Sequence, residues 1–119
     1  MTRAKDAVGA YGERVAVAHL VAQGMELLER NWRSTTGEID IVLRDGGSIV
    51  FCEVKTRRTL RFGTPTEALV PAKVRRLRRL AAEYLADSGR HAAEIRFDVV
   101  SVLPQRSGAA RVEHLRGAF

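Results

Sequence analysis

The chain has 119 residues, of which 45% are hydrophobic, and this content is enough for one core and one domain over residues 1–119. Twenty Lys and Arg residues against 14 Asp and Glu residues give a net charge of +6 at pH 7, which favours a polyanionic partner, nucleic acid ahead of an anionic membrane. The single cysteine, Cys52, excludes an internal disulfide framework and a multi-cysteine metal cluster.

The N-terminal segment predicts a helix over residues 5–24. Its apolar residues recur at spacings of four and three, and the expected inward stripe is Tyr11, Val15, Ala18, Ala22 and Met25. Glu13 lies on a second line at the edge of the same apolar arc. Charged residues interrupt the segment, so it lacks the apolar core of a signal peptide, and no run approaches the roughly 18 apolar residues of a membrane span. We therefore expect a cytoplasmic protein without a membrane partner.

Strands are predicted next over residues 25–33, 37–44 and 48–56, and the sequence RDGGS between the last two predicts an antiparallel hairpin. A second helix is expected over residues 71–86, ended by Gly89, with inward residues Val74, Leu77, Ala81, Tyr84 and Leu85. Strands follow over residues 94–103 and 111–115, the second within a weakly assigned tail, 104–119. The order αβββαββ predicts an α/β fold with a mixed sheet flanked by helices.

The second helix carries the densest positive charge of the chain. Five basic residues fall within seven positions with no acid between them: Lys73, Arg75, Arg76, Arg78 and Arg79. We predict that they form the outer face of the helix. Phosphate binding and an ordinary solvated helix face both explain such a run, and the sequence leaves the two open.

Two carboxylates and a lysine are set into the central hairpin. Side chains alternate along a strand, so Glu53 and Lys55 share a face, and the hairpin folds Asp40 back towards Glu53. Two carboxylates beside one lysine are unfavourable at the edge of a core unless a cation joins them. Oxygen ligands suit Mg²⁺ or Mn²⁺, held by Asp40, Glu53 and the Val54 carbonyl, with Lys55 orienting or deprotonating an attacking water. The alternative is a cross-strand salt-bridge cluster on a solvated face.

Three other residues have simpler expectations. Cys52 faces away from Glu53 and is predicted to be a small core residue. Trp32 is expected in core or rim packing, with base stacking as the alternative. Asp98 is expected to join a structural network with Arg96 or to lie at the edge of the site.

The pattern of Asp40, twelve intervening residues and Glu53-Val54-Lys55 resembles the signature of restriction-endonuclease-like nucleases. Together with YGERVAVAHLVAQG, NWRSTTGEIDIV, FGTPTEAL and KVRRLRRLAAEYL, it resembles the YraN family, small bacterial proteins similar to archaeal Holliday-junction resolvases. The resemblance implies a restriction-endonuclease-like core, metal ligands at Asp40 and Glu53, a catalytic Lys55 and a supporting carboxylate at Glu13. Many members of the nuclease group have Pro before the Asp, so Glu38 inherits no role.

The preferred interpretation is a metal-dependent nuclease acting on DNA, including branched DNA. The alternative is a catalytically silent module of the same fold that binds nucleic acid or recruits a partner. Clustered acids favour the enzyme, because acids without a metal would repel a phosphate backbone. An RNA substrate and a homodimer both stay open, since phosphate contacts alone do not identify the sugar.

Overall fold

The computed structural model describes residues 7–57 and 70–119. Within them the chain forms two helices and five strands: α1 (Ala7–Ala22), β1 (Glu26–Ser34), β2 (Gly37–Asp45), β3 (Ser48–Thr56), α2 (Pro71–Ser88), β4 (Glu94–Leu103) and β5 (Arg111–Leu115). All seven predicted elements are present, with bounds that differ by no more than two residues from the predicted ones. The order αβββαββ confirms the α/β class and is that of a restriction-endonuclease-like core.

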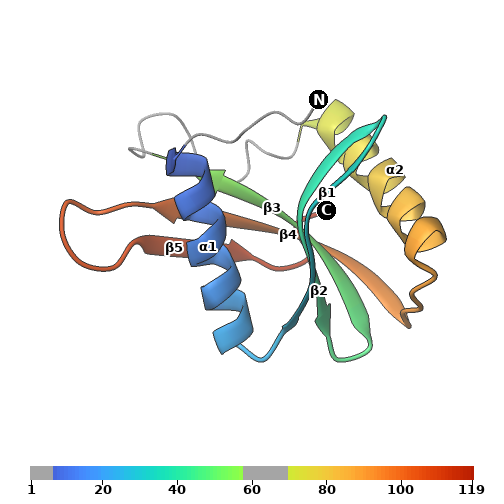
Figure 1. Cartoon of the computed structure of the whole chain (residues 1–119), viewed down its shortest axis with the longest axis horizontal. Coiled ribbons are helices and arrows are strands. Elements are labelled where there is room, and N and C mark those ends of the chain that lie inside the picture. The colour runs from blue at the N-terminus through green and yellow to red at the C-terminus, as the bar shows by residue number, and fades with distance from the viewer. Residues whose placement is uncertain (1–6, 58–69) are drawn as a thin grey trace.

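One five-stranded sheet, in the order β1-β2-β3-β4-β5, forms the centre of the molecule (Figure 1). The pairs β1–β2, β2–β3 and β4–β5 are antiparallel, whereas β3 and β4 are parallel, so the sheet is mixed. The chain passes from β3 to β4 through α2, as a parallel pair requires a long connection. The hairpin prediction is confirmed: β2 and β3 pair from Asp45–Ser48 at the turn, where Gly46 has φ 60°.

The two helices cover opposite faces of the sheet, and each face has its own hydrophobic cluster (Figure 1). Ala16 and Leu20 of α1 pack with Ile41, Val50 and Cys52, among others. On the other face, residues of α2 pack with residues of β2, β3 and β4, and the members are Ile39, Val42, Ile49, Phe51, Leu77, Leu80, Ala81, Tyr84 and Phe97. The predicted core role of Cys52 is confirmed, because its side chain is almost completely buried.

The inward face predicted for the first helix is correct in part: Tyr11 and Val15 pack against the core and Met25, just beyond α1, is buried, but the buried face is rotated from the predicted one. Ala18 and Ala22 are exposed, and the buried residues of the helix are Gly12, Glu13, Ala16 and Leu20. Gly12 explains the rotation, because it lets α1 approach β3 closely: a Cβ at Gly12 would overlap the Thr56 hydroxyl and lie 2.8 Å from Thr56 Cβ. A glycine adds nothing to a hydrophobic stripe, so the pattern of apolar residues could not locate this contact.

Helix α2 agrees better with its prediction. Leu77, Ala81 and Tyr84 are buried as expected, and Leu80 joins them. Pro71 occupies the first turn, and Gly89 ends the helix in a left-handed conformation with its N–H donating to the Leu85 carbonyl. No helix in the described part of the chain combines the length and the apolar character needed to cross a membrane.

Candidate functional site

Strands β2 and β3 separate at the predicted site. Their ladder ends at the pair Ile41–Cys52, while β3 continues to pair with β4 as far as Thr56. Asp40 is the next residue of β2 beyond that pair, across from Glu53. Its carboxylate accepts a hydrogen bond from the Val54 N–H at 2.8 Å. A side chain thus replaces the backbone partner, which satisfies a donor that the separating strands would otherwise leave unpaired.

The backbones of β1 and β2 are locally distorted next to Asp40, and the usual alternation of side chains between the two faces is interrupted there. Residues two apart on a regular strand share a face, yet Ile41 packs in the α1 cluster and Ile39 in the α2 cluster. The register of β1 places Asn31 across from Asp40, and Asn31 has the left-handed φ of 52°, which is uncommon for a residue other than glycine. The turn in both strands directs the Asp40 carboxylate towards β3. The sequence carries no signal for this distortion.

Asn31 carries a second unusual feature. Its side-chain oxygen is buried and has no hydrogen-bond partner within the described residues. Sequence reasoning assigned Asn31 no role, and nothing in the residue pattern marks it. A strained backbone and an unsatisfied buried acceptor beside Asp40 are features that folded proteins concentrate at functional sites.

Glu53 pairs with Lys73, a residue that was not predicted to belong to the site. Its carboxylate forms an ion pair with the Lys73 amine at 2.5 Å, and the two side chains are 12% and 20% exposed. Lys73 was predicted to lie on the outer basic face of α2. It lies instead in the first turn of the helix, directed at β3.

Lys55 follows Glu53 on the same face of β3. Burial lowers the pKa of Lys55, contact with the Lys73 amine and its positive charge lower it further, and Glu53 opposes the effect. The two lysines and Glu53 therefore form one group of interacting charges. A lysine beside a second cation in a partly buried setting loses its proton more readily than a solvated one.

Glu13 is buried, with 4% exposure, and approaches the sheet from the α1 side. The described residues contain no set of three or more His, Cys, Asp or Glu side chains placed to hold a metal. The structure thus brings Asp40, Glu53 and Lys55 to one end of the β2–β3 pair and adds Lys73. Among the described residues, Glu13 is not placed with Asp40 and Glu53 as a third carboxylate ligand.

The donor set suits a hard divalent cation. Asp40, Glu53 and the Val54 carbonyl offer only oxygen atoms, the ligands that Mg²⁺ and Mn²⁺ prefer. The nearest thiol, Cys52, is buried on the other face; burial raises its pKa well above the usual value, and the charges of Asp98, Asp40 and Glu53 raise it further. The Lys73 amine already occupies a cation position beside Glu53. By ligand type these residues suit Mg²⁺ or Mn²⁺ and not a metal bound by thiolates, and the described residues add no third acidic, His or Cys side chain.

The four arginines of α2, here called the arginine face, are Arg75, Arg76, Arg78 and Arg79. All four are exposed. The Arg78 guanidinium lies over the Phe97 ring, 5.2 Å from its centre, and Arg79 pairs with Glu83 at 3.5 Å. The face therefore presents positive charge to solvent in the N-terminal half of the helix.

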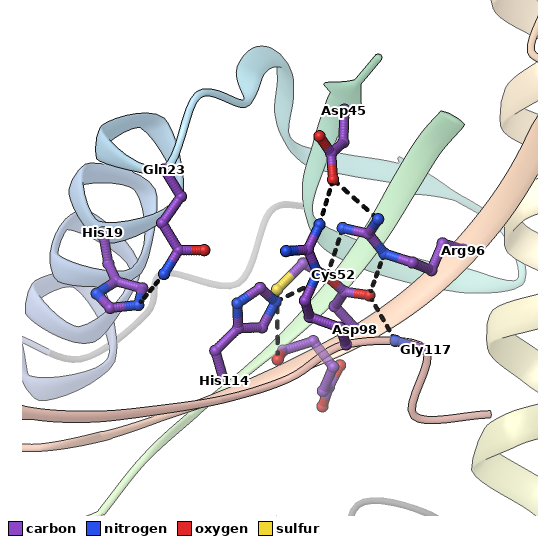
Figure 2. A network of polar contacts seen from close by, with 10 residues as sticks. His19, Gln23, Asp45, Cys52, Arg96, Asp98, His114 and Gly117 are labelled. Atoms are coloured by element: carbon purple, nitrogen blue, oxygen red, sulfur yellow. Dashed lines mark hydrogen bonds and ion pairs between the residues drawn. The ribbon is translucent and has the colours of Figure 1, made fainter. Parts of the chain in front are cut away.

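A second polar cluster lies on the α1 face of the sheet, centred on Asp98 (Figure 2). The fully buried Asp98 carboxylate bonds Arg96 at 2.9 Å and His114 at 2.7 Å and accepts the Gly117 N–H at 3.0 Å. Asp45, at the β2–β3 turn, accepts from Arg96. The predicted network of Asp98 with Arg96 is confirmed, and it fastens the C-terminal segment to the sheet.

A pocket of about 550 Å³ lies beside the C-terminal half of α2 and contains none of the predicted site residues. Trp32, Ser34 and Glu83 contribute to its lining. Trp32 also packs edge-on against Tyr84 with ring centres 5.5 Å apart, which confirms its predicted packing role. The Ser34 and Thr36 hydroxyls donate to the Glu83 carboxylate and lower its pKa, so the acid is already occupied by the protein.

Comparisons with a family model and with individual proteins both match the chain to UPF0102 proteins. A model of the uncharacterised protein family UPF0102 matches residues 12–102, which include every predicted site residue. The UPF0102 protein of Beutenbergia cavernae is 63% identical over 115 residues, covering 97% of this chain and 98% of that protein. The UPF0102 protein of a Nocardioides species is 57% identical, and the match covers 95% of this chain and 91% of that protein. The UPF0102 protein of Frankia alni is 56% identical, and the match covers 98% of each chain.

Proposed function

The chain belongs to the uncharacterised protein family UPF0102, and from its site geometry we propose that it is a metal-dependent nuclease that hydrolyses phosphodiester bonds in DNA. The observation that carries the proposal is the position of Asp40 and Glu53-Val54-Lys55 where β2 leaves β3. Beyond this point the edge of β3 meets the Asp40 side chain in place of the β2 backbone. A purely structural salt-bridge cluster would not require Asp40 to abandon the strand ladder.

Each residue has a distinct part in the proposed reaction. The Val54 N–H fixes the orientation of the Asp40 carboxylate, and Glu53 supplies the second acidic ligand for Mg²⁺ or Mn²⁺. The cation, when bound, supplies Lewis-acid polarisation of a phosphoryl oxygen. Lys55 positions the attacking water against the phosphorus, and this placement lowers the barrier by holding the reactants in line. Glu13 supports the ligands from the α1 side.

The arginine face supports a nucleic-acid substrate. Planar guanidinium groups form paired hydrogen bonds with phosphate, and each phosphate contact releases condensed counterions. Four such groups begin two residues after Lys73, so a phosphate backbone bound along α2 passes the candidate site. By the resemblance to junction resolvases we propose that branched DNA is included among the substrates. A test set must therefore contain linear, flapped and four-way DNA, together with RNA.

The ion pair between Glu53 and Lys73 supports a second candidate function. If Lys73 neutralises Glu53 permanently, the acidic group no longer needs a metal and no longer repels phosphate. The chain would then be a catalytically silent module that binds nucleic acid or recruits a partner. The two candidates differ in one measurable property, which is the affinity for a divalent cation.

Calorimetric titration with Mn²⁺ distinguishes them. The wild type is expected to bind one ion, and Asp40→Asn is expected to weaken the binding at least roughly tenfold, because the neutral amide is a much poorer ligand. Asp45→Asn is the matched control: it makes the same change on the same strand, at the other end, and should leave the affinity unchanged. Equal Mn²⁺ affinities in the wild type and Asp40→Asn would refute the proposed site.

A further inference from the structure

Lys73 differs from the arginines that follow it in the sequence. The buried residues of α2 are Leu77, Leu80, Ala81 and Tyr84, and Lys73 precedes Leu77 by four positions. Residues four apart share one side of a helix, so Lys73 belongs to the inward side. Its side chain is 20% exposed and ends on Glu53, whereas the arginine face is open to solvent. Lys73 is thus a constituent of the site and not of the outer basic face.

Glu53 already has positive charges close to it in the metal-free protein: Lys73 pairs with it, Lys55 lies on the same face of β3, and Arg57 lies near Lys55. Asp40 and Glu53 carry two negative charges, and Lys55 and Lys73 carry two positive charges. A divalent cation between the carboxylates would bring two further positive charges close to the Lys73 amine. Like charges in a partly buried group repel strongly, because little water is present to screen them. The Glu53 side chain is only 12% exposed, so we expect that its carboxylate does not bind the Lys73 amine and a divalent cation equally well at the same time.

We propose that Lys73 is an exchangeable counter-ion of Glu53: it holds the carboxylate in the metal-free protein and is displaced when a divalent cation binds. This inference rests on the proposed metal-dependent function. The displaced amine stays in the first turn of α2, two residues before the arginine face, and a substrate phosphate bound along α2 would be its new partner. Metal binding and substrate binding then favour one another, and by linkage each raises the affinity for the other by the same factor.

The test compares Lys73→Met with Lys73→Arg. Met removes the competing cation and keeps much of the side-chain volume, so Mn²⁺ affinity is expected to rise on the order of tenfold, a change typical of residues next to metal ligands. Arg restores the positive charge, so its Mn²⁺ affinity should stay near that of the wild type. Arg76→Gln is the matched control, because it removes one exposed charge from the same helix and should leave Mn²⁺ affinity unchanged.

Thermal melts give a second readout that does not depend on catalysis. In EDTA, Lys73→Met leaves Glu53 partly buried without its cation, so the melting temperature should fall; saturating Mn²⁺ should remove the deficit. If Lys73→Met is too unstable to titrate, the rise of its melting temperature with Mn²⁺ concentration supplies the affinity. A variant that stays equally destabilised with and without Mn²⁺ would contradict the exchange.

DNA binding in EDTA separates Lys73 from the arginine face. Lys73 is engaged by Glu53 in the metal-free protein, so the double variant Lys73→Met/Glu53→Gln, which removes both charges of the pair, should leave the affinity for a fluorescent duplex unchanged, whereas Arg76→Gln should lower it. Equal losses in the two variants would show that Lys73 is an ordinary surface cation and overturn the inference.

The outcomes separate this inference from the proposed function. Tighter Mn²⁺ binding by Lys73→Met, with Lys73→Arg like the wild type, supports the exchange. If the wild type and Lys73→Met bind Mn²⁺ equally, the exchange is refuted while the nuclease proposal stands. If neither protein binds Mn²⁺, the metal-dependent function fails and the exchange fails with it.

Discussion

Replacing Asp98 with Asn is expected to destabilise the protein by about 2 kcal/mol at pH 7 and by about half as much at pH 3. Asp98 is fully buried, and burial alone would raise its pKa. Hydrogen bonds from His114, Arg96 and the Gly117 N–H outweigh burial and lower the pKa from 3.8 to about 2. At about 1.36 kcal/mol per pKa unit, this difference gives the stated loss at neutral pH.

The sign of the pH dependence follows from the direction of the shift. A carboxylate whose pKa is lower in the folded protein contributes its full stability above the unfolded pKa, near 3.8, and loses it as the pH falls towards about 2. Asn imitates the protonated acid in shape and charge. The difference between wild type and Asp98→Asn should therefore be constant from pH 7 to 5 and shrink below pH 4.

Urea unfolding at pH 7, 5, 4 and 3 measures this difference directly. A change of about 2 kcal/mol also lowers the melting temperature of a chain of this size by roughly 8 °C. Asp45→Asn is the control, because Asp45 bonds the same Arg96 but is partly exposed, and solvent weakens such pairs to about 1 kcal/mol or less. Equal stabilities at pH 7, or a difference that does not shrink by pH 3, would refute the assignment of Asp98 as the buried anion of this network.

Two further predictions concern the packing of α1 and the surface of α2. Gly12→Ala should lower stability by about 1–3 kcal/mol despite the better helix propensity of Ala, because the new Cβ overlaps Thr56; Gly47→Ala, whose Cβ would meet Ala93 at 3.5 Å, should cost much less. A neutral Gly12→Ala variant in thermal melts would show that α1 can shift away from β3 without loss. Changing the whole arginine face to Gln should reduce the slope of log DNA affinity against log salt by about 0.9 for each phosphate that the protein no longer neutralises. An unchanged slope would show that DNA binds elsewhere.

The sequence was most informative where local chemistry decides the structure. The β2–β3 hairpin follows from the glycines at the turn and from the two runs of apolar residues beside it, and its ladder ends at Ile41–Cys52, one residue before Asp40 and Glu53. The Asp98–Arg96 contact follows from their spacing of two residues on one strand. In each case the partners are near in sequence or fixed by a turn, so a pattern of a few residues is enough.

Features that depend on contacts between distant segments could not be predicted. The buried face of α1 is set by the fit of Gly12 against Thr56, and helix periodicity does not contain that information. Lys73 stands in a run of basic residues, and only the position of α2 against β3 shows that it meets Glu53. The turn at Asn31 and Asp40 arises because β2 must leave β3 while still pairing with β1.

A single-turnover cleavage assay tests directly whether this site catalyses the proposed metal-dependent reaction. Labelled four-way and linear DNA are incubated with wild type, Lys55→Met or Arg76→Gln, in Mg²⁺, Mn²⁺ or EDTA. We expect cleavage by the wild type only with a divalent cation, a loss of at least about 100-fold in Lys55→Met although its Mn²⁺ affinity is no lower than that of the wild type, and near-normal rates for Arg76→Gln at saturating protein. No cleavage by the wild type, cleavage that persists in EDTA, or an equal rate in Lys55→Met would contradict the claim.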